Sequence, residues 1–285
     1  MLLKWLNEYR RKARQAKIDR LTRQLADREP KDWRVIDDEV IHWPKAGAMW
    51  ADETRILKEL AECGPLARNA VAAIAESAEQ SLWGHWLKAS GEKKPGRSMI
   101  HHADLVGCSG HTKVHLEALL RALEALHAIG ADEPAVVPLL REVIEECRPP
   151  SEATLGMMKR AAQQALSIGA IRQIPDDVLY RWSLRGIALN ALGKAADIMV
   201  TQERPFVDCS ESVADALHDP KLVVRLAAFG ALVALAPSLP KERRSWAAPR
   251  VLSVLRTPDF ARALRQNGLD AARLSARWEA YRQPE

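Results

Sequence analysis

Residue types that favour β-sheets are scarce in this sequence of 285 residues. Phenylalanine and tyrosine occur three times each, and the runs of β-branched residues are short. Alanine and leucine dominate instead, and both favour helices over strands. The composition therefore predicts a protein that is helical throughout.

Cysteine is also scarce, and long apolar runs are missing. The four cysteines are widely spaced and form no CxxC pair, which indicates a reduced chain in the cytoplasm. No apolar run approaches the roughly 18 residues of a membrane span. The first residues, MLLKWLNEYRRK, have too short an apolar stretch for a signal peptide. We therefore expect a cytoplasmic protein without a transmembrane segment.

Basic residues are concentrated at the two ends of the chain, within a net charge of +5. Residues 1–30 hold nine Lys or Arg and four Asp or Glu, and residues 241–285 hold ten and five. The stretch between them, 31–240, holds 23 basic and 28 acidic residues. Such asymmetry can attract nucleic acid or an acidic protein surface, but solvated helix faces are the commoner origin of such charge.

Residues 1–30 predict one basic amphipathic helix that Pro30 ends. Its apolar positions recur every three or four residues, at Leu2, Leu6, Tyr9, Ala13 and Ala16. The candidate partner-binding residues on its other faces are Arg10, Arg11, Lys12, Arg14 and Lys17. Beyond Ala16 the apolar stripe shifts phase. We therefore expect the first half to pack on the body, with Trp5 as an anchor, and the second half to project basic side chains.

Residues 31–110 predict an irregular, tryptophan-rich helical cap. Six of the nine tryptophans lie before residue 87. Residues 31–50 lack a helical period and predict a packed loop, and helices are expected at 52–63 and 65–79. We expect Trp33, Trp43, Trp50, Trp83 and Trp86 to fill the core of this cap. A pocket or a surface for stacking bases is the alternative.

Residues 111–285 predict helices in close succession, separated by Pro, Gly, Asp or Ser. The expected helices lie near 112–129, 134–147, 151–168, 176–199, 207–217, 220–236, 241–256 and 259–282. Short connections between antiparallel helices are typical of stacked helical hairpins. No segment with the alternating period of a strand interrupts them.

The stretch DPKLVVRLAAFGALVAL, Asp219 to Leu235, resembles the second helix of a HEAT repeat. In that family an Asp in the turn, a following Pro and an Arg six residues after the Asp recur, as Asp219, Pro220 and Arg225 do here. Asp219 suits a helix cap, and Pro220 suits the first helical position. Nearly every side of the helix is apolar, so we expect it to be buried between neighbours.

The resemblance implies a right-handed α-solenoid of HEAT- or armadillo-like hairpins over 111–285. It also implies that Asp219 and Arg225 join ladders of polar contacts between adjacent repeats. A weaker echo, RWSLRGIALNAL from Arg181, lies 44 residues before the matching segment from Arg225. A step of about 40–47 residues is typical of these repeats. An irregular helical bundle is the alternative architecture.

Histidines gather in HHADLVGCSGHTKVH, His101 to His115. The candidate zinc ligands are His102, Cys108, His111 and His115. Zinc accepts such nitrogen and sulfur donors in a tetrahedron. The spacing matches no standard zinc signature, however, and capping residues place the helix start at Thr112, with His111 outside the helix. We therefore expect no cofactor, with zinc at this loop as the alternative.

These patterns predict a non-enzymatic scaffold or adaptor that binds a protein partner with a curved helical-repeat surface. The basic N-terminal helix would serve as its docking arm on an acidic protein surface. The resemblance leaves nucleic-acid binding as the alternative, because some HEAT-like proteins grip duplex backbones and a few are glycosylases that excise alkylated bases. A zinc-dependent site around His102, Cys108, His111 and His115 is the second alternative.

Overall fold

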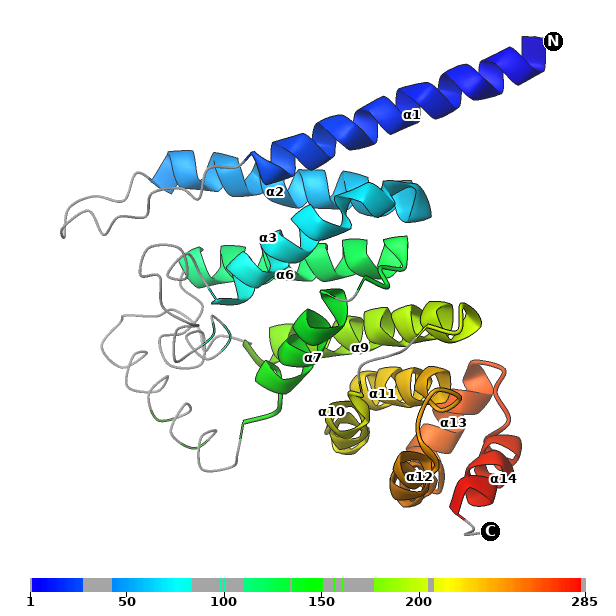
Figure 1. Cartoon of the computed structure of the whole chain (residues 1–285). Helices are drawn as coiled ribbons and strands as arrows, with labels where there is room; N and C mark the ends of the chain where they lie inside the picture. The colour runs from blue at the N-terminus through cyan, green and yellow to red at the C-terminus, as the bar shows by residue number, and fades with distance from the viewer. Residues whose placement is uncertain are drawn as a thin grey trace. The chain divides into compact units, whose positions relative to one another are not determined.

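The computed structural model describes residues 2–27, 43–83, 98, 100, 110–133, 135–150, 156, 160, 177–204 and 208–282. The regular elements in these ranges are all helices, without a strand among them (Figure 1). The predicted all-α class is therefore confirmed. None of the helices in these ranges has the length and apolar character that crossing a bilayer requires. The helices form two compact units, which are described one at a time, and their arrangement as a solenoid stays a prediction.

The first unit contains α1 (Leu2–Ala26), α2 (Trp43–Cys63), the 3₁₀ segment η1 (Gly64–Ala70), α3 (Val71–Trp83) and α6 (Gly110–Ile129). α6 packs along both α2 and α3, and α1 lies against α2, η1 and α3. The core between them is aliphatic and fully buried, with Leu57, Leu60, Ile74, Leu119 and Leu123. Burying each such side chain stabilises the folded state by about 1.5–3 kcal/mol. The stable core therefore provides a fixed surface on which α1 packs.

α2 begins inside the stretch that was expected to be a loop. Its first residue is Trp43, and Pro44 follows, where a proline suits the start of a helix. The loop prediction is therefore wrong for residues 43–50, because the small residues of this first part hide the apolar period. Trp83 is buried at the end of α3, as expected for a residue of the cap core. Trp33 and Trp86 lie outside the described residues.

The second unit contains α7 (Val136–Glu146), α9 (Asp177–Thr201), α10 (Ser210–Asp215), the 3₁₀ turn η2 (Ala216–His218), α11 (Leu222–Leu235), α12 (Lys241–Leu255), α13 (Pro258–Gln266) and α14 (Ala271–Arg282). The helix expected over 151–168 falls almost wholly outside the described residues. α9 and α11 approach closely at Gly193, where an added Cβ would stand 3.1 Å from the Cα of Ala231. A larger residue at Gly193 would therefore push these two helices apart.

α11 is buried on one side and exposed on the other. Its buried side includes Phe229, whose ring packs edge-to-face on Phe260 with centroids 5.6 Å apart. Val223 is 62% exposed, and Gly230 is exposed as well. The expected burial therefore holds in part, since seven of the 14 residues of α11 are buried, and the strip with Val223 and Gly230 stays exposed.

The single helix expected over 259–282 is two helices, α13 and α14. Gly268 adopts a left-handed φ of +72° and ends α13. The carboxylate of Asp270 then accepts a hydrogen bond from the backbone N–H of Ala272 at 2.8 Å, which caps the start of α14. This break allows Trp278 of α14 to become almost fully buried, and α14 to pack along α12.

Candidate partner-binding arm

The two halves of α1 have opposite surroundings. In the second half Ile18, Leu21 and Leu25 are buried, at spacings of three and four residues. In the first half the side chains of residues 5–16 are exposed, apart from a partly exposed Leu6. This half extends beyond α2 in Figure 1. We call residues 5–16 the arm.

The structure reverses the expected roles of these halves. Trp5 is 62% exposed, so the expectation that it anchors the first half on the body is wrong. Ile18, Leu21 and Leu25 hold α1 instead, because their aliphatic side chains are buried where α1 lies against α2, η1 and α3. The apolar stripe does shift phase after Ala16, but the part that packs is the one after the shift, with Ile18, Leu21 and Leu25.

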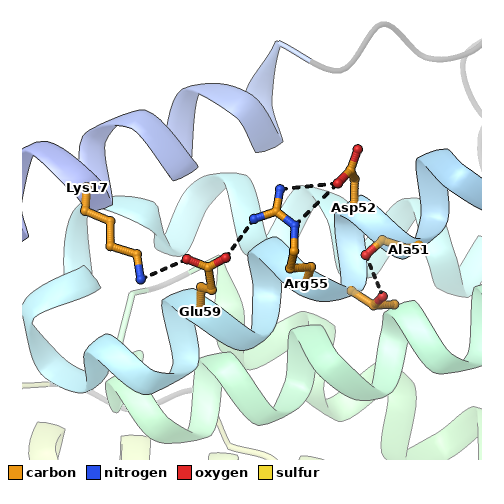
Figure 2. Close-up of polar contacts among 6 residues, drawn as sticks. Lys17, Ala51, Asp52, Arg55 and Glu59 are labelled. Carbon is orange, nitrogen blue, oxygen red and sulfur yellow. Dashed lines mark hydrogen bonds and ion pairs between the residues drawn. The ribbon is translucent and has the colours of Figure 1, made fainter.

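An ion-pair cluster joins α1 to α2 beside these buried residues. Figure 2 shows the carboxylate of Glu59 between Lys17, whose Nζ lies 2.8 Å away, and Arg55, whose Nη1 donates to it at 2.7 Å. Arg55 also reaches Asp52, with 3.2 Å between Nη2 and Oδ1. Lys17 therefore ties α1 to α2, although it was predicted to be one of the residues that contact a partner.

This cluster changes the proton affinity of its members. The hydrogen bond from Lys17, followed by that from Arg55, lowers the pKa of Glu59 below its ordinary value. The hydrogen bond to Glu59 raises the pKa of Lys17 in turn. Each partner thus favours the charged form of the other. Asp19 adds a second polar link to the body, because Asn69 donates to its carboxylate at 2.8 Å.

The other four predicted partner-binding residues belong to the arm. Lys12 makes an exposed pair with Glu8, with 3.2 Å between Nζ and Oε1. Arg10, Arg11 and Arg14 are exposed, and none of them forms an ion pair with the described residues. An exposed pair such as Lys12–Glu8 contributes little stability. The arm therefore offers cationic groups that the protein's own described fold does not require.

The arm also carries an aromatic pair that the sequence analysis did not assign to a binding surface. The rings of Trp5 and Tyr9 stack with centroids 5.7 Å apart and an angle of 17° between their planes. Tyr9 is 61% exposed, about as much as Trp5. A signal for this exposure was present in the sequence, because a helix packed along its whole length keeps one apolar phase.

Asp219 and Arg225 both take part in long-range ion pairs within the second unit. Asp219 pairs with Arg185 of α9 at 2.5 Å, and both side chains are almost completely buried. Arg225 of α11 pairs with Asp259 of α13, whose side chain is half exposed. Each pair joins an arginine to an aspartate 34 positions later. The two pairs are related by a step of 40 residues along the sequence.

This step of 40 residues between the ion pairs differs from the 44 residues that separate the similar sequence segments at Arg181 and Arg225. By the ion pair that it makes, Arg185 corresponds to Arg225. Arg181 donates instead to the backbone oxygens of Glu146 and Arg148, at 2.9 and 2.8 Å. The α11 turn also differs in detail, because α11 starts at Leu222, two residues after Pro220. Asp219 accepts its hydrogen bond from the N–H of Lys221 at 2.9 Å, before the helix begins.

The candidate zinc ligands are only partly described. His102 and Cys108 lie outside the described residues. α6 starts at Gly110, so the expected helix start at Thr112 is wrong and His111 lies inside the helix, four residues before His115. His115 is buried, with 3% exposure. No group of three or more potential metal ligands occurs among the described residues.

Comparison of the sequence with protein-family models, with curated proteins and with solved structures gives no match. The resemblance to HEAT repeats therefore rests on the residues quoted for it, from Asp219 to Leu235. Among the described residues, the arm combines exposed cations with an exposed aromatic pair.

Proposed function

We propose that this protein is a non-enzymatic interaction scaffold that docks on an acidic partner through the arm. The observation that carries this proposal is the exposure of Arg10, Arg11 and Arg14 on a regular helix without ion-pair partners in the described chain. Such cations attract an anionic surface and accelerate association with it. The packed second half of α1 supplies a rigid base for the arm.

The second unit offers a separate surface for a protein partner. Val223 and Gly230 of α11 are exposed among apolar neighbours, Leu222 and Leu226, which are partly exposed. Apolar surface at the centre of a contact and polar groups around it are typical of protein interfaces. If this unit is an array of HEAT-like repeats, α11 presents one strip of its binding face.

Nucleic-acid binding is the second candidate function, because the same unpaired arginines would neutralise phosphates. In that case Arg10→Gln/Arg14→Gln should flatten the salt dependence of duplex binding, by about two units of slope if both charges contact phosphates. Tight duplex binding that depends strongly on salt and is lost in this variant would favour this candidate over the scaffold.

Co-purification from the native cell, with detergent present to dissolve membranes, tests the scaffold proposal. The tagged wild-type chain is compared with Arg10→Gln/Arg14→Gln and with Arg20→Gln/Arg23→Gln, which makes the same change in charge on the packed half of α1. We expect mass spectrometry to identify a protein that co-purifies with both the wild type and the control. The arm variant should recover at least about fivefold less of this protein. Equal recovery with all three chains would contradict docking through the arm.

A further inference from the structure

We infer that the arm, besides docking on an acidic protein, also binds an anionic lipid bilayer, on which it lies flat. This inference rests on the proposed role of the arm in docking. The first observation that supports it is the aromatic pair. The stacked rings of Trp5 and Tyr9 lie at one end of a helix and are both mostly exposed to water. Aromatic rings with a polar edge are typical of the boundary between lipid and water.

The faces of the arm are arranged for contact with one flat surface. Trp5, Tyr9 and Ala13 follow one another at intervals of four residues, so they share a face of the helix. Arg10 and Lys12 lie on the two sides of this face, at the level where lipid headgroups would stand. The remaining bases, Arg11 and Arg14, lie on the far side, within reach of the potential of an anionic leaflet.

A deep groove on a protein would fit this arrangement of side chains less well than the flat surface of a bilayer. Charged side chains occupy the two flanks and the far side of the arm, so a groove that enclosed the helix would bury several of them. Burying cations without partners is costly. A bilayer contacts the apolar face and the flanks only, and it leaves Arg11 and Arg14 in water.

Single-stranded nucleic acid and a second copy of the chain fit less well for other reasons. Trp5 and Tyr9 stack on one another, so one face of each ring is already covered and unavailable to a base. Two arms side by side would bring Arg10, Arg11 and Arg14 of one copy close to the same cations of the other. An anionic bilayer instead complements both the charge and the aromatic face.

Vesicle sedimentation of the full chain tests the inference directly. The probes are vesicles of phosphatidylcholine mixed with phosphatidylglycerol and vesicles of phosphatidylcholine alone. We expect binding to the anionic vesicles that exceeds binding to the neutral ones by at least about tenfold, because several bases near an anionic leaflet each add about fivefold in affinity. Equal binding to both kinds of vesicle, or none to either, would overturn the inference.

Matched variants separate the aromatic from the basic contribution. Arg10→Gln/Arg14→Gln should weaken binding by about 25-fold, since it removes two bases, whereas Arg20→Gln/Arg23→Gln should change it far less. Trp5→Ala/Tyr9→Ala should weaken binding by at least about tenfold, whereas Leu66→Ala, at another exposed apolar residue, should leave it unchanged. Circular dichroism checks that each variant keeps its helices.

Two outcomes with other probes would overturn the lipid inference. The first is binding to polyglutamate or duplex DNA that is as tight as binding to the anionic vesicles. The second is vesicle binding that the aromatic variant retains in full, because charge alone would then explain it. Neither outcome affects the co-purification test, which detergent makes independent of lipid, so failure of this inference and failure of the scaffold proposal are distinguishable.

Discussion

Asp219 and Asp259 make the same kind of ion pair in very different surroundings. The Asp219–Arg185 pair is almost fully buried, whereas the side chain of Asp259 is 52% exposed. Asp219→Asn leaves the Arg185 cation buried without its counter-ion, so it should lower the free energy of unfolding by about 3–5 kcal/mol. Asp259→Asn should cost only a small part of that, because water replaces the lost partner. Denaturant melts of both variants measure the difference, and equal costs would contradict the burial of Arg185.

Glu59 makes the anchoring of α1 dependent on pH. Its pKa is lowered by Lys17 and Arg55, so it stabilises the fold above its unfolded pKa, and this contribution is lost as pH falls through the folded pKa. Glu59→Gln should cost about 1 kcal/mol or less at pH 7, since Lys17 is 42% exposed and solvent screens the pair. Urea melts at several pH values should show the difference between wild type and variant vanishing in the acid range. A difference that persists there would contradict this role.

α11 tests the division of one helix into a buried and an exposed side. Phe229→Asp places a carboxylate at a residue that is 3% exposed and packs on Phe260, so we expect a loss of more than about 3 kcal/mol. Val223→Asp, on the same helix, should stay within about 0.5 kcal/mol. Thermal melts compare the two, and similar losses would mean that the side of Val223 is covered.

The helices illustrate what the sequence can and cannot predict. The turn residues before them, Asp219 and Pro220 in one case and Pro240 in the other, predicted α11 and α12 within two residues. The start of α2 was missed since its first turns carry small residues, and the end of α13 was missed although Gly268 and Asp270 form a stop followed by a cap. In α1 the period revealed two stripes, but which stripe is buried depends on where α2, η1 and α3 lie. The basic charge of the N-terminal helix was therefore predicted correctly, but the wrong half of the helix was expected to pack on the body.

The whole chain combines two helical units with a basic projection from the first. The basic character of the N-terminal region was readable from charge counts, whereas the pairing of Lys17 with Glu59 depends on which helices meet, which no local pattern encodes. The 40-residue relation between the two Arg–Asp pairs likewise emerges only when the turns are in place.

Truncation tests whether the arm is dispensable for folding. Among the side chains described from residue 5 onward, removal of residues 1–14 takes away exposed ones and the partly exposed Leu6, so the melting temperature should change by less than about 2 °C. Removal of residues 1–26 also removes Ile18, Leu21 and Leu25, which are buried, and should lower it by several times as much. Differential scanning calorimetry of both chains measures this, and a large effect of the shorter truncation would contradict a free arm.

Hydrogen exchange along α1, followed by mass spectrometry on the full chain, tests whether the arm is free. In the structure, residues 5–16 form the arm and residues 18–26 are packed on the first unit. Amides of the arm should therefore exchange quickly, because an unpacked helix end opens readily, while those after Ile18 should be strongly protected. Equal, strong protection over the whole of α1 would contradict a free arm, because it would mean that the first half is covered within the protein itself.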